Sequence, residues 1–137
     1  NVLGNHRQAI EDYNRAIEIK PGYAEAYYNR GTAYNSLGNY QQAIADFNRA
    51  IEIKPDYAMA YNNRGGAYIV LGNYGQAIED FSRAIAIRPD FAGAYNNRGV
   101  AYVRSGKNNL AVNDLKAAAR LGDERARNFL KSQGINW

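Results

Sequence analysis

Two consecutive stretches of 34 residues, 24–57 and 58–91, align without a gap and carry the same residue at 23 of 34 positions. The first reads AEAYYNRGTAYNSLGNYQQAIADFNRAIEIKPDY and the second AMAYNNRGGAYIVLGNYGQAIEDFSRAIAIRPDF. A repeat of this length is typical of a solenoid, in which each unit buries its apolar face only by stacking on the next unit. The repeat therefore constrains the fold more than any other feature of the chain.

Each unit reads as two amphipathic helices. Over residues 24–37, and again over residues 40–53, small, aromatic and aliphatic residues recur at the three- and four-residue spacing of a helix face. Gly38 should end the first helix, Asn39 is suited to cap the second, and Pro55 should end the second. The sequence thus predicts an all-α solenoid.

The residues at fixed places in the unit resemble the tetratricopeptide repeat. The signature places hold Tyr27, Gly31, Tyr34, Ala43, Phe47, Ala50 and Pro55, then Tyr61, Gly65, Tyr68, Ala77, Phe81, Ala84 and Pro89, and in weaker form Tyr95, Gly99, Tyr102, Ala111, Leu115 and Ala118. Two departures are Tyr where the family often has Trp, and Arg where it usually has Leu before the glycine. The resemblance implies a right-handed superhelix of antiparallel helix pairs whose first helices line a concave groove.

We expect a single domain over residues 1–137, with about three full repeats, a leading orphan helix and a C-terminal capping helix. Residues 1–23 correspond to a partial repeat with only its second helix, because NVLGN at the start matches the end of a first helix. Residues 24–57 and 58–91 are full repeats, residues 92–125 are a degenerate repeat, and residues 124–133 read as the capping helix. The chain does not begin with methionine, so we expect it to be a fragment.

The composition argues against several kinds of site. The chain has no cysteine and one histidine, His6, which leaves no thiolate or multi-histidine metal site within one chain. No apolar run reaches the about 18 residues of a membrane span, and the net charge of +4 is too evenly interleaved with acids to predict a nucleic-acid partner. Neither a catalytic triad nor a phosphate loop is present, so we expect no enzyme and no cofactor. The compartment is not indicated, and the cytoplasm is a default assignment.

The two best units differ from each other along one stripe of the first helix. Counted from the first residue of the unit, places 2, 5, 9, 12 and 13 vary and fall within one arc, whereas the opposite places stay constant. A stripe that is released from packing faces solvent, and several exposed apolar residues on it would mark an interface. The candidate contact residues on this stripe are Tyr28, Met59, Asn62, Ile69, Val70, Asn96, Val100, Val103 and Arg104.

Place 6 lies in the same arc but does not vary, since it holds Asn29, Asn63 and Asn97. A primary amide carries an acceptor and two donors, so three of them at a fixed spacing could hold the backbone of an extended peptide. Such a ladder resembles the asparagine array of the tetratricopeptide superhelix in protein O-GlcNAc transferase. The alternative is that these amides bond the adjacent helix.

Arg30, Arg64 and Arg98 lie at the edge of the packing arc, where an isolated charge would be costly. Every second helix carries an acid at one fixed place: Asp12, Asp46, Asp80 and Asp114. We expect each of these arginines to pair with one of the aspartates, within or between units.

The leading functional reading is a scaffold that binds a peptide segment or a partner helix in the groove. Two alternatives stay open at this point: a self-assembly module that oligomerises through its open end or groove, and the substrate-selecting arm of a larger enzyme. The partner is expected to be a protein or peptide of unknown identity, with a homo-oligomer as a second possibility.

Overall fold

The computed structural model describes the backbone of residues 2–137 and the side chains from Gly4 onward, so Asn1 lies outside the described residues. The described part forms eight α-helices and no strand. They are α1 (Val2–Ile19), α2 (Ala24–Ser36), α3 (Tyr40–Ile53), α4 (Ala58–Val70), α5 (Tyr74–Ile87), α6 (Ala92–Arg104), α7 (Asn108–Arg120) and α8 (Glu124–Ser132).

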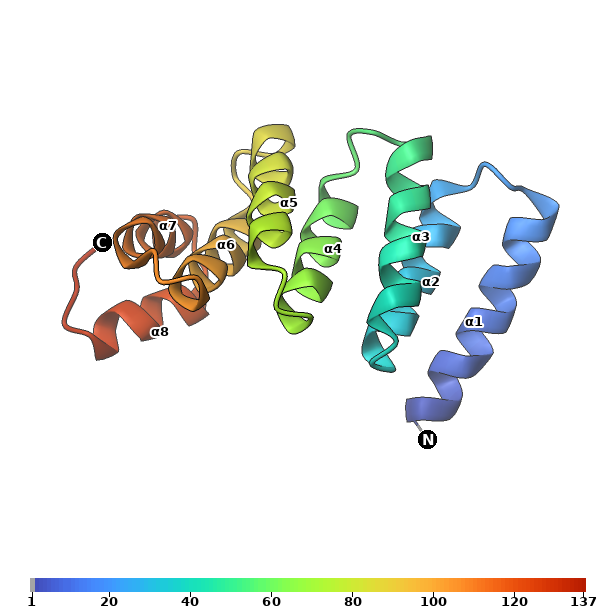
Figure 1. Cartoon of the computed structure of the whole chain (residues 1–137), viewed down its shortest axis with the longest axis horizontal. Coiled ribbons are helices and arrows are strands. Elements are labelled where there is room, and N and C mark those ends of the chain that lie inside the picture. Colours follow the sequence, from blue (N-terminus) through green and yellow to red (C-terminus); the bar gives the residue numbers. More distant parts are fainter. Residues whose placement is uncertain (1) are drawn as a thin grey trace.

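The helices follow one another in a single row, with the two ends of the chain at opposite ends of that row (Figure 1). Each helix packs chiefly on the helices before and after it, and α4 also contacts α2 and α6 directly. The pairs α2–α3, α4–α5 and α6–α7 are the predicted units. The all-α solenoid expected from the repeat is therefore confirmed.

Small residues on the first helix and a large one on the second make the core of each unit. Phe81 is fully buried in α5, and its ring lies against Gly65 of α4 so closely that a Cβ there would meet it at 2.8 Å. Leu115 takes the same place opposite Gly99 in the third unit. The repeated glycine is thus required by the close approach of the two helices and not by its backbone freedom.

A left-handed glycine ends each first helix. Gly38 has φ of 78°, its N–H donates to the carbonyl of Asn35, and the next N–H, that of Asn39, donates to the carbonyl of Tyr34. This is the expected glycine stop. Asn39 does precede α3, but its side chain caps no N–H of that helix, so the predicted cap is wrong.

The N-terminal helix differs from its expected start. α1 begins at Val2 and runs through Gly4, whereas the sequence predicted an orphan helix from His6 after the end of another. Gly4 thus keeps helical backbone and does not take the left-handed conformation of Gly38. The core-facing residues of α1, such as Tyr13, stay half-exposed, because only α2 packs against them.

α8 packs on α7 at the other end of the row, where Ala126 and Leu130 are fully buried. Asp123 caps this helix by accepting a hydrogen bond from the N–H of Ala126 at 2.9 Å. The rest of α8 is largely exposed, as a terminal helix of a solenoid should be.

Candidate functional site

The first helices α2, α4 and α6 lie side by side, since α4 contacts both α2 and α6, and we call the side of them that carries the variable stripe the first-helix face. Met59, Val70, Val100 and Val103 are exposed on it, with between 36% and 58% of each residue accessible. These are apolar residues that the comparison of units predicted to be exposed, with Met59 and Val70 at opposite ends of α4. Arg104, at the end of α6, is also exposed.

Four residues of the predicted stripe are not exposed, and two of them, Tyr28 and Asn62, are half-buried. Ile69 is half-buried against the core formed by Ala77, Phe81 and Ala101. Asn96 is buried, with 7% of its surface accessible. The arc drawn from the sequence was therefore slightly too wide.

The amides of the first-helix face link one first helix to the next. The Nδ2 group of Asn63 donates to the hydroxyl of Tyr28 at 3.1 Å, and that of Asn97 donates to the Oδ1 atom of Asn62 at 3.1 Å. Asn62 in turn donates to Asn63 at 3.3 Å, whereas Asn29 is exposed. The bonding of adjacent helices, left open as the alternative, thus takes place, and it uses only part of the capacity of each amide.

Tyr28 also lies against an aromatic neighbour. Its ring centroid is 4.9 Å from that of Tyr57, which belongs to the loop before α4. Burial, with lesser contributions from Tyr28 and Glu25, raises the pKa of Tyr57 to about 12. The polar end of the first-helix face is thus built from a pair of tyrosine rings and the amide of Asn63.

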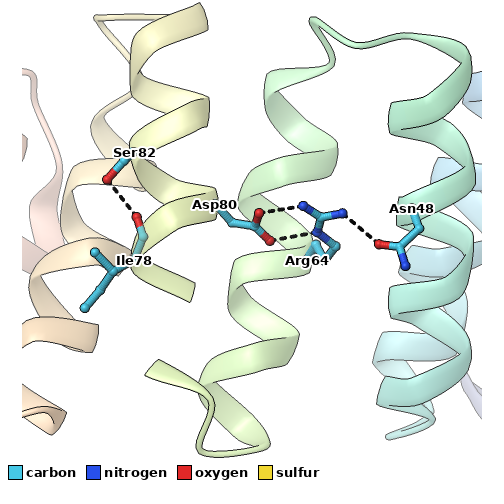
Figure 2. Close-up of polar contacts among 5 residues, drawn as sticks. All are labelled: Asn48, Arg64, Ile78, Asp80 and Ser82. Carbon is cyan, nitrogen blue, oxygen red and sulfur yellow. Dashed lines mark hydrogen bonds and ion pairs between the residues drawn. The ribbon is translucent and has the colours of Figure 1, made fainter. Parts of the chain in front are cut away.

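Each predicted arginine pairs with the aspartate of its own unit, which confirms that expectation. Arg64 donates to both carboxylate oxygens of Asp80, at 2.8 and 2.6 Å, and its third nitrogen donates to Asn48 of the preceding unit at 2.7 Å (Figure 2). Arg30 and Arg98 repeat this geometry in the units on either side. Each of the three arginines therefore links the two helices of its own unit and connects them to the second helix before it.

The charges of this pair influence each other. Burial raises the pKa of Asp80, an effect that the hydrogen bond and the charge of Arg64 oppose. For Arg64, burial acts to lower the pKa, but the hydrogen bond and the charge of Asp80 prevail and raise it. The two side chains form an ion pair, with Nη2 of Arg64 2.6 Å from Oδ1 of Asp80.

A hollow of about 500 Å³ opens where the first-helix face meets α8, and we call it the α6–α8 hollow. Its lining comprises Asn96, Asn97, Val100, Val103 and Arg104 of α6, Leu115 of α7, and Arg125 and Phe129 of α8. The sequence singled out the α6 residues but missed those of α7 and α8. The signal that could have found Phe129 is its spacing, since it stands 34 residues after Tyr95 and so at the place of a first helix.

Other chemistry finds no support in the described part of the chain. No three His, Cys, Asp or Glu side chains among these residues gather in a way that could hold a metal ion. None of the helices of residues 2–137 has the length and apolar character needed to cross a membrane. His6 lines a small hollow of about 180 Å³ beside Asn29 and Tyr13, with no acid or cysteine in its lining.

Four family models match the chain. Three are described as tetratricopeptide repeat and match residues 24–57, 47–79 and 92–121, and one described as TPR repeat matches residues 3–38 and 66–106. No curated protein matches the sequence.

Several solved structures resemble this one. A crystal structure of MamA is 34% identical, with a TM-score of 0.82 over 91% of this chain and 73% of that one. The first TPR of Spaghetti (RPAP3), bound to the HSP90 peptide SRMEEVD, is 27% identical, with a TM-score of 0.76 over 81% of this chain and 91% of that one. The "41-end" structure of MamA from Desulfovibrio magneticus RS-1 is 22% identical and shows the shared fold alone, with a TM-score of 0.84 over 93% and 73% of the two chains.

Proposed function

This chain belongs to the tetratricopeptide repeat family, and on that premise we propose that it is a non-catalytic scaffold whose first-helix face binds a peptide segment or a partner helix. The observation that carries the proposal is the exposed apolar patch of Met59, Val70, Val100 and Val103. Exposed apolar residues that gather on one face usually mark an interaction surface. The RPAP3 domain, which is similar in fold and was solved with a peptide bound, supports a peptide as the kind of ligand.

The amides beside this patch would hold the backbone of the bound segment. Asn63 and Asn97 each donate one side-chain N–H to the preceding first helix, which leaves the second N–H of each amide for a ligand. Each such bond is worth about 0.5–1.5 kcal/mol, so the amides alone give weak binding and the apolar residues must add most of the affinity.

A screen of short peptides by fluorescence anisotropy, followed by substitution on the face, tests the proposal. We expect Val70→Asp to weaken the best binder at least about tenfold, because it places a charge where an apolar contact is lost. Leu110→Asp is the matched control, since Leu110 is equally exposed but lies on the second helix α7. Equal losses for the two variants would refute binding on the first-helix face.

The ladder has a test of its own. Asn63→Ala should weaken an extended peptide by about 2- to 10-fold, the worth of one hydrogen bond. If binding is unchanged, the amides serve only to link the helices.

Self-assembly is the second candidate, and α1 favours it. Tyr13 and Ile17 are only half-buried, whereas Phe47, the counterpart of Tyr13, is fully buried against Gly31 in the first helix of its own unit. Light scattering over a concentration series would show the mass rising if a second copy covers α1. We expect Tyr13→Glu to abolish such a rise, and a rise that survives this change would place the contact elsewhere.

A further inference from the structure

The hydrogen bonds that link successive first helices stop at Asn96. At place 5 of the two preceding units, Tyr28 and Asn62 each accept a hydrogen bond from the place 6 asparagine of the next first helix. Asn96 occupies place 5 of α6, but 34 residues after Asn97 the chain has Lys131. The series of amide bonds therefore has no next member to meet Asn96.

Asn96 is nevertheless buried. More than nine-tenths of its surface is covered, and it makes no side-chain hydrogen bond to any of the described residues, although it lines the α6–α8 hollow. The polar atoms of the Asn96 amide keep some accessible surface and line the hollow, so in the free protein they can bond water. A group of a ligand in the hollow could take the place of that water as the hydrogen-bond partner of Asn96.

The walls of the hollow suit an apolar group. Val100, Val103 and Phe129 face it from α6 and α8, and Leu115 of α7 lies between them. Both helices pack on α7, which keeps them apart. A space of about 500 Å³ falls within the usual range of small ligand sites and accommodates one large side chain with the backbone around it.

The surroundings of the hollow are cationic. Residues 92–137 hold eight Lys or Arg and three Asp or Glu, whereas residues 1–91 hold nine and ten. The excess positive charge of the whole chain thus lies in its last third, so the even interleaving of basic and acidic residues holds only for residues 1–91. Among the described residues Arg104 forms no ion pair, and Arg125 pairs with Asp123 at 3.1 Å while two thirds of its side chain stays exposed. A ligand with negative charge would be attracted to this end of the molecule.

From these observations we propose that the α6–α8 hollow binds a large apolar side chain flanked by Asp or Glu within an acidic peptide segment. The apolar side chain would lie against Val103 and Phe129, the backbone beside it would bond the amide of Asn96, and the flanking carboxylates would pair with Arg104 and Arg125. This inference rests on the proposed function and specifies the chemistry of the segment and the end of the face that selects it. The apolar walls favour a peptide over a nucleic acid, whose phosphates need donors in place of methyl groups.

Three synthetic peptides test the proposal with the whole chain. All are nine residues long, acetylated and amidated, with Gly and Ser at the ends. One has a central Leu with two Glu on each side, one replaces that Leu by Ser, and one replaces the four Glu by Gln. We expect the first to bind at least about tenfold more tightly than the Ser peptide, the effect of burying one leucine. It should also bind more tightly than the Gln peptide, by a margin that shrinks as salt is added. A version with a free carboxyl terminus should gain no more than about twofold, since the proposed contacts are to side-chain carboxylates.

Substitutions locate the site. Val103→Asp should abolish binding of the Leu peptide, and Arg104→Gln should weaken it about 2- to 5-fold as one exposed ion pair is lost. Arg120→Gln is the matched control, because Arg120 lies in the same cationic third but does not line the hollow. Asn96→Leu keeps the branched shape of the side chain and removes its polar groups. It should leave the melting temperature unchanged or higher while it weakens peptide binding, and this split separates a ligand contact from a structural role.

Nuclear magnetic resonance of the same titration separates the possible outcomes. Shifts of the Asn96 side-chain amide and of Val103 support the proposal. Shifts confined to Met59 and Val70 would overturn it while leaving the first-helix face as the binding surface. The proposal would also be overturned if no peptide binds at millimolar concentration, or if Arg104→Gln and Arg120→Gln weaken binding equally. It would be overturned as well if a short oligouridylate binds more tightly than the Leu peptide. The Val70→Asp screen remains the separate test of the proposed function.

Discussion

Replacing Arg64 by leucine, the residue that most often precedes the glycine in this family, should destabilise the chain. The change removes both hydrogen bonds to Asp80 and the bond to Asn48. The carboxylate of Asp80 would then stay in the core, with 7% of its side chain exposed and without a counter-charge. The loss of its hydrogen bond costs Asn48 less, because its side chain reaches solvent and can bond water.

The magnitude follows from this geometry. Breaking a buried ion pair by removing one partner costs about 3–5 kcal/mol, and because 18% of the Arg64 side chain is exposed we expect a cost just below this range, about 2–3 kcal/mol. For a chain of this size that corresponds to a fall in melting temperature of about 6–12 °C. The double variant Arg64→Leu with Asp80→Ala should be more stable than Arg64→Leu alone, because it leaves no buried charge.

Urea denaturation of the wild type, both single variants and the double variant gives the coupling free energy of the pair, which should be about 2 kcal/mol. Arg49→Leu is the control, since Arg49 forms an exposed ion pair with Glu52 and its loss should not change the free energy of unfolding measurably. The difference in the free energy of unfolding between the wild type and Arg64→Leu should also become smaller as the pH falls towards 3.8, the ordinary pKa of an aspartate. Burial raises the folded pKa of Asp80 above its unfolded value, and without Arg64 nothing opposes this rise, so the folded pKa is higher still in the variant. Protonation of Asp80 therefore favours the folded state more in the variant than in the wild type, and this contribution to stability is lost as the pH rises.

One result would refute this reasoning. If Arg64→Leu alone is as stable as the wild type at neutral pH, Asp80 is not held in the core by its counter-charge, and the arginine is dispensable for stacking.

Three further predictions concern other parts of the chain. Gly65→Ala should lower the free energy of unfolding in urea by about 1–3 kcal/mol, because the new methyl group would meet the buried ring of Phe81 at 2.8 Å. Gly66→Ala has open space around the new methyl group and should raise the free energy of unfolding by about 0.5–1 kcal/mol. Similar values for the two variants would contradict the packing argument. The pKa of Tyr57 is raised from 10.0 to about 12, so its protonated form stabilises the folded state fully below pH 10, and this stabilisation is lost as the pH rises to 12. The stability of Tyr57→Phe should therefore fall less steeply with rising pH than that of the wild type, as measured by circular dichroism in alkali. Asp123→Ala removes the cap of α8 and should speed amide hydrogen exchange there about fivefold, the worth of about 1 kcal/mol, with no change in α4.

The fold could be predicted because the same pattern of residues recurs in consecutive units. The period, the glycine stops and the alternation of small and aromatic residues each identify the helix pairs, and the structure agrees. The start of α1 was not predictable in the same way. Gly4 stands at the place of Gly38 but keeps helical backbone, and a local pattern does not show which of these conformations a glycine adopts.

The candidate site was predicted only in part for a related reason. Variation between units reveals which side of a first helix is free, and it found Met59, Val70 and Val103. It cannot reveal how α8 lies against α6 and α7, because α8 has no counterpart that keeps the same sequence. Phe129 and Arg125 therefore became visible only in three dimensions.

The arginine bridges have a consequence for the length of the array. Arg64 reaches 16 residues back to Asn48 and 16 residues forward to Asp80, and Arg30 and Arg98 span the same intervals. Each of these junctions between units is thus held by the same kind of hydrogen bond, from an arginine to the residue 16 positions before it. A block of 34 residues can be duplicated or deleted in the gene and both new junctions will close as the old ones did, so the array is free to change its number of units without a new interface having to arise.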